Sequence, residues 1–210
     1  MPDPSSITIA VPKGRVLKSL ATRFQRAGVD PSVLLSDDRR LVRSTPDGSV
    51  HFLLLKPDDV PTYVEYGAAD LGIVGRDVLS EREYDLYVPL DLGIGRCKMA
   101  VAGLKGKPPS ANELRPLRVA TKFVNIATRY YREQRRQVEI IYVGGSVELA
   151  PITGLSDVIV DLVETGETLR QNGLEVFEDI CEISSVVIAN IAAFKLKRAR
   201  IQKLLADLEG

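Results

Sequence analysis

The chain has 210 residues, of which 45% are hydrophobic, so it can bury a substantial core as one large domain or as two small lobes. Lysine plus arginine and aspartate plus glutamate each number 28, which gives no overall field toward nucleic acid or an anionic membrane. We expect neither partner, so any anion-binding site must be local. No run approaches the roughly 18 to 20 apolar residues of a membrane span, and no secretory signal is visible. Cys97 and Cys181 lie far apart in apolar contexts, which predicts buried, reduced thiols in a cytoplasmic protein.

The first half of the chain alternates strands and helices. An apolar strand at Ile7–Val11 opens into a glycine turn and then into a helix whose apolar residues recur at helical spacing up to Gly28. The further elements expected are strands at Leu34–Leu35, Leu41–Val42, Val50–Leu55, Leu71–Val74, Tyr87–Leu90 and Lys98–Ala102, with helices at about Asp58–Tyr66 and Arg76–Glu83. This alternation predicts a mostly parallel sheet with helices on its faces.

A segment rich in proline, glycine and lysine, Gly103–Ser110, marks a lobe boundary. Beyond it the expected elements are strands at Arg118–Ala120, Glu139–Val143, Val158–Val160, Leu174–Glu182 and Ser185–Asn190, with helices at Ile126–Gln134, Val147–Ala150, Glu167–Asn172 and Lys195–Leu208. The chain is expected to return to the first lobe near Ser184, so the lobes are residues 1–103 plus 184–210 and residues 104–183. The predicted class is α/β, with mostly parallel sheets in two lobes and a cleft between them.

The segment Asp157–Leu169 is an apolar strand that delivers Asp161 into a Thr-Gly-x-Thr turn and then a helix. Such a turn places backbone N–H groups and two threonine hydroxyls around one point at the positive end of the helix, where a phosphomonoester fits. Asp161 can reach a ribose diol attached to that phosphate. The segment resembles the 5-phosphoribosyl 1-pyrophosphate (PRPP) loop of phosphoribosyltransferases, although many of those carry a second acid where this chain has Leu162. The alternative is an ordinary strand–turn–helix connection.

Lys13-Gly14-Arg15 stands where the first strand opens into a helix, so its two cations could clamp a pyrophosphate; a solvated turn is the alternative. The segment Gly67–Gly75 is rich in small residues around Asp70, which suits either a closely approaching ligand or a tightly packed strand. Further cations near expected strand ends, each more typical of a surface charge, are Arg39, Arg40, Lys56, Arg96 and Lys98.

Other chemistry is not indicated by the sequence. The single histidine, His51, lies within an expected strand and is interpreted as structural. There is no serine elbow, no Cys/His couple and no metal-ligand cluster, which argues against hydrolysis through a covalent intermediate. The arginines between Arg129 and Arg136 are most simply a solvated helix face rather than an RNA site.

Three segments together resemble ATP phosphoribosyltransferase, the first enzyme of histidine biosynthesis: Val11–Arg15, Asp59–Gly75 and Asp161–Leu169. The resemblance runs essentially end to end, and Leu162 fits the loop of this family. It implies a fold similar to the type II periplasmic binding proteins, with two α/β lobes and the site in the cleft. Longer members append a histidine-binding regulatory domain, for which this chain is expected to have no room. It therefore resembles the short form, whose catalytic chains work with a regulatory subunit similar to histidyl-tRNA synthetase in a hetero-oligomer; a dimer of catalytic chains is also expected.

The implied reaction joins N1 of the adenine of ATP to C1 of the ribose of PRPP and expels pyrophosphate, with Mg²⁺ on the pyrophosphate. The resemblance assigns catalysis to Asp161, Lys13 and Arg15. It assigns PRPP to Asp161, Glu164, Thr165, Gly166, Glu167 and Thr168, with Glu164 helping to hold Mg²⁺ through water. ATP or pyrophosphate falls to Lys13, Gly14, Arg15, Arg39, Lys56, Asp70, Asp91 and Arg96. Two alternatives stay open: a two-lobed binding or sensing module without chemistry, and a phosphoribosyltransferase for another base.

Overall fold

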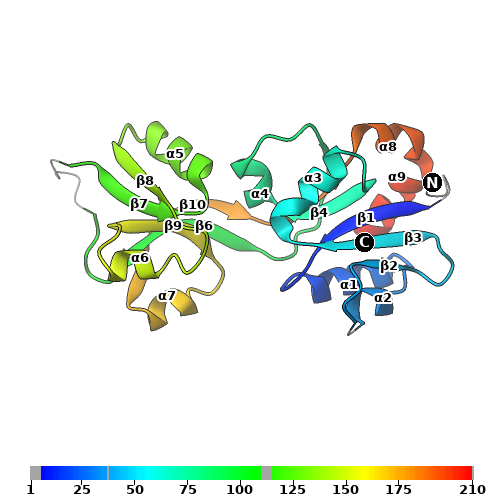
Figure 1. The fold of residues 1–210 in the computed structure, drawn as a ribbon, viewed down its shortest axis with the longest axis horizontal. Helices are drawn as coiled ribbons and strands as arrows, with labels where there is room; N and C mark the ends of the chain where they lie inside the picture. Colours follow the sequence, from blue (N-terminus) through cyan, green and yellow to red (C-terminus); the bar gives the residue numbers. More distant parts are fainter. Residues whose placement is uncertain (1–5, 37, 110–114, 210) are drawn as a thin grey trace. The chain divides into compact units, whose positions relative to one another are not determined.

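The structure, a computed structural model, describes residues 6–36, 38–109 and 115–209. The chain forms two compact units, drawn in Figure 1. Unit 1 comprises residues 1–79, 83–95 and 184–210, and unit 2 comprises residues 80–82 and 96–183. None of the described helices is long and apolar enough to cross a membrane.

Unit 1 is built on a six-stranded sheet with the order β2-β3-β1-β4-β11-β5. Its strands are β1 (Ile7–Pro12), β2 (Val42–Ser44), β3 (Val50–Leu55), β4 (Leu71–Gly75), β5 (Tyr87–Asp91) and β11 (Ser185–Ala189). The neighbours β3, β1 and β4 are parallel, whereas β2 and β11 run antiparallel to the strands beside them. The carboxyl ends of β1, β3, β4 and β5 therefore lie at one edge of the sheet, which we call the basic edge because of the cations described below.

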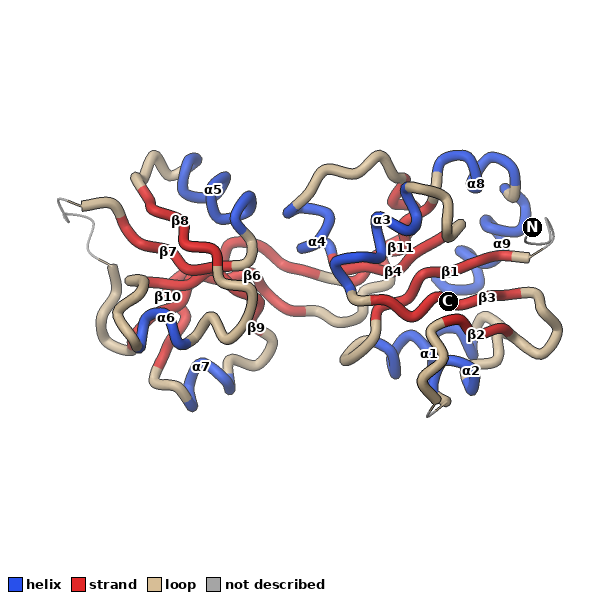
Figure 2. The backbone as a smooth tube through the Cα atoms, in the orientation of Figure 1, coloured by secondary structure: helices blue, strands red, loops and turns tan. Residues whose placement is uncertain are grey.

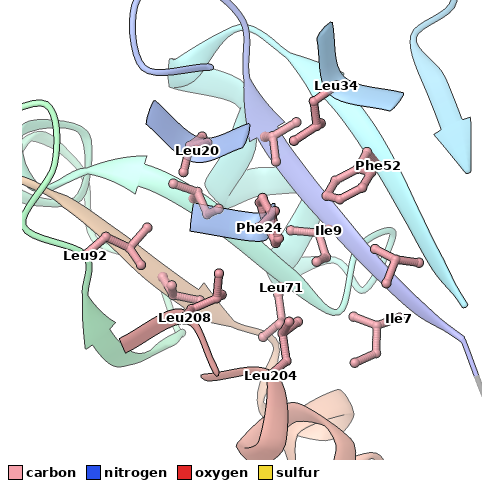
Figure 3. Packing of buried hydrophobic residues seen from close by; sticks show 14 of the residues in the cluster. Ile7, Ile9, Leu20, Phe24, Leu34, Phe52, Leu71, Leu92, Leu204 and Leu208 are labelled. Atoms are coloured by element: carbon pink, nitrogen blue, oxygen red, sulfur yellow. The ribbon is translucent and has the colours of Figure 1, made fainter. Parts of the chain in front are cut away.

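Helices cover both faces of the unit 1 sheet. On one face lie α1 (Leu17–Arg26), α2 (Ser32–Leu35) and α9 (Arg198–Glu209), and on the other α3 (Val60–Glu65) and α4 (Arg76–Glu81). The remaining elements are the 3-10 turn η1 (Pro57–Asp59) and α8 (Ile191–Leu196). Figure 3 shows Leu20, Phe24 and Leu208 converging with Ile9 and Leu71, all buried in one cluster. Burial on both faces explains why the central strands β1, β4 and β11 are near-continuous apolar runs.

The small-residue segment before and within β4 has a packing role. A Cβ atom at Gly72 would lie 2.7 Å from Val64 Cγ2 and 2.9 Å from Val60 Cγ1. Helix α3 therefore rests directly on the backbone of β4, at a distance that only glycine permits. Of the two interpretations of this segment, tight packing is the one that Gly72 supports.

Unit 2 is built on a five-stranded sheet with the order β10-β6-β9-β7-β8 (Figure 2). Its strands are β6 (Cys97–Leu104), β7 (Leu117–Thr121), β8 (Val138–Tyr142), β9 (Val158–Val163) and β10 (Leu174–Ile183), and its helices are α5 (Val124–Glu133), α6 (Leu149–Ile152) and α7 (Glu167–Gln171). Helix α5 packs on one face of the sheet, and α6 and α7 pack on the other. Strands β9, β7 and β8 are parallel, so their carboxyl ends meet at one edge, here named the loop edge.

The α/β class with a sheet in each of two lobes is confirmed, but the sheets are mixed rather than mostly parallel. Five of the nine strand pairings in the described residues are antiparallel. Strand β6 follows β5 in the chain but belongs to the unit 2 sheet, and β11 follows β10 but belongs to the unit 1 sheet. The alternation of strands and helices within a lobe therefore did not specify their direction.

The chain passes from unit 1 to unit 2 at Gly95–Arg96, not at the expected 103/104 boundary. The reason is that β6 pairs with both β9 and β10 in the unit 2 sheet. The segment expected as a linker instead follows β6 within unit 2, and its last residue, Ser110, lies outside the described residues.

Three smaller expectations are also corrected. Leu34 and Leu35 belong to α2 rather than to a strand, and the single helix expected at the carboxyl end is two helices, α8 and α9, on either side of Lys197. Of the two cysteines, both expected to be buried, only Cys97 is; Cys181 is exposed on β10.

Asp157, just before β9, fixes the edge of unit 2 opposite to the loop edge. Its two carboxylate oxygens accept hydrogen bonds from Arg115 Nη1 (2.7 Å) and Nη2 (2.9 Å), and from the backbone N–H (2.9 Å) and Nη2 (3.2 Å) of Arg118. The side chain is 17% exposed. The hydrogen bonds from Arg115, followed by those from Arg118, hold the pKa of Asp157 well below its usual value.

We predict that Asp157→Asn lowers the free energy of unfolding at pH 7 by about 1–3 kcal/mol, because charge-assisted hydrogen bonds to both arginines are lost. Since the pKa of Asp157 is lower in the folded than in the unfolded chain, its stabilisation is present above about pH 4 and fades as the pH falls below that value. Urea denaturation should therefore show a smaller difference from wild type at pH 3 than at pH 7, because the stabilisation has begun to fall but is not yet lost at pH 3. The control is Asp179→Asn, whose ion pair with Lys98 is half exposed and should contribute less than about 1 kcal/mol. An equal difference at both pH values would contradict the assignment.

Candidate active site

The Thr-Gly-x-Thr segment is a closed turn at the carboxyl end of β9. Gly166 has φ +71°, the left-handed conformation that glycine adopts without strain, and α7 begins at the next residue. Thr165 Oγ1 accepts a hydrogen bond from the Glu167 N–H (3.3 Å), and Arg170 Nη1 donates to the Thr165 carbonyl (3.0 Å). The turn is therefore held in shape by bonds within its own segment, without any ligand.

This turn leaves donors directed outward. Within the described residues, no backbone carbonyl accepts a hydrogen bond from the N–H groups of Thr165, Gly166 or Thr168. Both threonines are exposed and Gly166 is half-buried. Three amides and two hydroxyls in four residues form a cradle suited to a phosphate group.

The acidic residues around the turn differ in their surroundings. Asp161 is half-buried on β9, opposite Ala100 of β6, and its Oδ1 accepts from the Leu162 N–H (2.8 Å). Glu164 is exposed directly after β9. Glu167 is held on α7 by Arg170 Nη2 (2.6 Å) and Gln171 Nε2 (2.9 Å), and the bond from Arg170 is the main cause of its lowered pKa. The Glu167 carboxylate is thus engaged by its own helix and its backbone N–H by Thr165, so Glu167 adds no donor to the cradle.

Cations gather at the basic edge of unit 1. Lys13, Gly14 and Arg15 follow β1 and are exposed, and Lys56 follows β3. The Lys13 N–H donates to the Leu55 carbonyl (2.9 Å), which ties the two strand ends together. Gly14 has φ +101°, and a Cβ there would meet nothing within 4 Å, so the backbone turn is open to a ligand.

Arg39 lies at the same edge. Strand β2 pairs antiparallel with β3, with Val42 opposite Leu53, and continuing that register places Arg39 opposite Lys56. Its neighbour Arg40 is instead bound to Asp38 through Nη2 (2.6 Å). The side chain of Arg43, only 8% exposed, donates to the Val33 and Leu34 carbonyls and so fixes this loop. The structure therefore places Arg39, Lys56, Lys13 and Arg15 at the same edge of the sheet.

Asp91 ends β5 at this edge and is the centre of a hydrogen-bonded cluster. Its Oδ2 accepts from Ser184 Oγ (2.8 Å) and from Arg76 Nη2 (3.2 Å), and its Oδ1 accepts from the Gly93 N–H (2.9 Å). The Gly93 bond is the main cause of its lowered pKa. Neither Arg76 nor Ser184 was predicted from the sequence to be a site residue, although Arg76 follows a parallel strand just as Lys13 and Lys56 do. Arg96 is exposed at the start of unit 2.

Asp70 does not lie with these residues. It precedes β4, and the register that pairs Ile9 with Leu71 puts it at the amino ends of β1 and β4, opposite to the basic edge. Its Oδ2 accepts from the Thr8 N–H (2.8 Å) and from Lys197 Nζ (2.8 Å), and its side chain is only 13% exposed. Asp70 joins β1 to the segment between α8 and α9, a structural role rather than the expected contact with ATP. The side chain of His51 also has a structural contact, because its Nδ1 lies 2.7 Å from Ser44 Oγ on the neighbouring strand β2.

The carboxylates that could serve a metal ion are few. Among the described residues, no group of three or more histidine, cysteine, aspartate and glutamate side chains is placed to hold one. Mg²⁺ commonly keeps several waters and binds one or two carboxylates plus substrate phosphates. Asp161 and Glu164, three residues apart at the loop edge, fit that limited requirement.

Comparisons with known proteins agree over nearly the whole chain. The model of the family described as HisG, ATP phosphoribosyltransferase, matches residues 56–210. An ATP phosphoribosyltransferase of Sorangium cellulosum is 56% identical over 97% of this chain and 95% of its own length. One of Thermoanaerobacter sp. strain X514 is 51% identical, with the same two coverages of 97% and 95%. Among solved structures, the ATP phosphoribosyl transferase (HisG:HisZ) complex from Thermotoga maritima is similar with a TM-score of 0.82 and 36% identity, over 97% of this chain and 96% of that chain. The chain belongs to the ATP phosphoribosyltransferase family.

Proposed function

We propose that this chain is the catalytic subunit of a short-form ATP phosphoribosyltransferase, which joins N1 of the adenine of ATP to C1 of PRPP in the first step of histidine biosynthesis. The observation that carries the proposal is the cradle of Thr165, Gly166 and Thr168, whose N–H groups have no backbone acceptor among the described residues. A family that uses PRPP needs a site for its 5-phosphate, and this turn has the donors for one.

In this proposal the loop edge of unit 2 binds PRPP. The amides of Thr165, Gly166 and Thr168 and the hydroxyls of the two threonines hold the 5-phosphate, and Asp161 accepts hydrogen bonds from the ribose hydroxyls. Asp161 is at the height of Ala100 on β6 and two residues before the end of β9, so its carboxylate is on a rigid strand rather than on the turn. A rigid support favours catalysis because it keeps C1 in one orientation.

The basic edge of unit 1 is proposed to bind the polyphosphate of ATP or the pyrophosphate. Lys13, Arg15, Arg39 and Lys56 provide four positive charges from three connections at one sheet edge, and Gly14 allows the anion to approach the backbone. Asp91, oriented by Arg76, Ser184 and Gly93, is assigned to a polar group of the nucleotide, and Arg96 to phosphate. Asp70 is left out of this assignment. The cleft expected between the lobes stays a prediction.

The chemistry needs charge stabilisation more than proton transfer. The N1 lone pair of adenine is already available to attack C1, and the C1–O bond breaks as pyrophosphate leaves with the electron pair. The ribose ring gains positive character while the leaving group gains negative charge, so preorganised cations lower the barrier. Mg²⁺, held by Glu164 through water and by the phosphates, would supply further positive charge at the leaving group. The single histidine, His51, lies near the amino end of β3, away from the basic edge, and this reaction does not require it.

Membership of the family favours this reaction over a binding module and over transfer to another base. The Thermotoga maritima structure is a HisG:HisZ complex, which supports a regulatory partner of the same kind for this chain, similar to histidyl-tRNA synthetase. A dimer of catalytic chains within that hetero-oligomer and a cytoplasmic location, where ATP is available, complete the proposal.

Asp161→Asn is predicted to weaken PRPP binding about 10- to 100-fold, because a neutral amide accepts weaker hydrogen bonds from the ribose. Turnover should fall with it, while the urea midpoint changes little. Calorimetric titration with PRPP measures the first effect. Asp157→Asn, at the other end of the same strand, is the matched control, with reduced stability and unchanged PRPP affinity. Normal PRPP binding by Asp161→Asn would refute the role of Asp161.

Gly166→Ala is predicted to raise the KM for PRPP about tenfold, since a side chain at φ +71° strains the turn by roughly 1–2 kcal/mol. Gly173→Ala carries a similar strain, at φ +72°, after the end of α7. It should lose comparable stability with little change in KM. Steady-state kinetics and thermal unfolding of both variants separate the two effects, and an equal change in KM would show that the cradle has no special part in binding.

The purified chain alone is predicted to turn over slowly and without inhibition by histidine. Addition of the histidyl-tRNA-synthetase-like subunit of the source organism should raise the rate and make it sensitive to histidine. The assay follows the absorbance of N1-ribosylated ATP in the presence of ATP, PRPP and Mg²⁺. Full, histidine-inhibited turnover by the chain alone would contradict the short-form assignment, and absence of product under all conditions would favour a binding module.

A further inference from the structure

Lys122 is a cation at the loop edge that the assignments above do not use. It follows β7, which is the parallel neighbour of β9 in the unit 2 sheet (Figure 1). The register pairs Val119 with Val158 and Ala120 with Ile159. Continued by two residues, it places Lys122 at the height of Asp161 on the adjacent strand, about 4.8 Å away across the sheet.

The backbone around Lys122 is fixed on both sides. The Thr121 side chain is completely buried, and its Oγ1 donates to the Val160 carbonyl (2.6 Å) and accepts from the Phe123 N–H (2.8 Å). The first bond attaches Thr121 to β9 at the residue directly before Asp161. The second bond holds Phe123 in the bend. Lys122 is thus presented from a rigid bend, although its side chain itself is long and mobile.

The charge of Lys122 is not used by a carboxylate in the described structure. Its Nζ lies 4.6 Å from the centre of the Phe123 ring, and Phe123 is itself buried. Two other cations near this edge are engaged by acids, Lys98 by Asp179 and Arg170 by Glu167. A contact with an aromatic ring is weaker than a charge-assisted hydrogen bond to phosphate, so Lys122 can leave the ring when a phosphate group arrives.

We propose that Lys122 binds the pyrophosphate group of PRPP. This inference rests on the proposed function, since it takes the 5-phosphate to lie in the cradle and the ribose hydroxyls to lie at Asp161. The pyrophosphate is attached to C1, next to the hydroxyl-bearing C2, so it lies beside Asp161 rather than in the turn four to seven residues farther along the chain. Lys122, at the height of Asp161, is therefore placed for the pyrophosphate and contributes positive charge where the leaving group gains negative charge.

The decisive experiment is calorimetric titration of the 210-residue chain with PRPP and with inorganic pyrophosphate, both in the presence of Mg²⁺. Lys122→Met keeps the apolar stem over Phe123 and removes the charge, so it should weaken both ligands about 10- to 100-fold. Lys122→Arg should stay within about threefold of wild type, because the charge and the hydrogen bonds are retained. Lys105→Met, an exposed lysine after the far end of β6, should bind both ligands normally.

The possible outcomes are separable. Unchanged PRPP binding by Lys122→Met overturns the inference while the proposed function stands, provided that wild type binds PRPP and Asp161→Asn does not. Loss of PRPP affinity with unchanged pyrophosphate affinity would place Lys122 at the 5-phosphate and would overturn the pyrophosphate assignment. A purely structural role is tested by thermal unfolding, because it would lower the melting temperature of Lys122→Met, and Lys122→Arg would not restore binding. Failure of wild type to bind PRPP would reject the proposed function itself.

Discussion

The basic edge and the loop edge both depend on one constraint, the parallel pairing of neighbouring strands. Because β3, β1 and β4 run in one direction, the connections after them emerge at one edge of the unit 1 sheet, and the cations of residues 13–15 and 56 meet there. The same rule in unit 2 brings the turn after β9 beside the bend after β7. Residues distant in sequence thus become neighbours through backbone hydrogen bonds alone, before any ligand is present.

The sequence predicted most of the architecture and the composition of both edges. Local patterns were sufficient for the turn at Gly166 and for the cations after β1 and β3, because strand, glycine and helix follow one another directly. Local patterns predicted the wrong element or boundary where packing or pairing with residues distant in the sequence decides the structure. Leu34 and Leu35 resembled a strand, yet Leu34 packs from a helix into the unit 1 core. The expected 103/104 boundary is wrong because the sequence of β6 alone does not indicate that this strand pairs with β9 and β10.

Asp70 and Lys122 show that the position of a charged residue in the sheet cannot be read from the segment around it. Asp70 stands in a glycine-rich segment of the kind that approaches ligands, but the register of β1 and β4 places it at the opposite end of the sheet, paired with Lys197. Lys122 stands in an unremarkable segment, and only the pairing of β7 with β9 places it beside Asp161. In each case sheet register, which no short sequence window contains, determines at which edge of the sheet a charged residue lies.

The discontinuity of unit 1 has a consequence for how the nascent chain folds. Strand β11, which lies between β4 and β5, consists of residues 185–189, whereas the unit 2 sheet is complete once residue 183 has been made. During synthesis from the amino terminus, unit 2 can fold first, while one edge of β4 stays unpaired until β11 has been made. Until residues 185–189 have left the ribosome, the segment carrying Lys13 and Arg15 belongs to an open sheet, which is the form most exposed to aggregation.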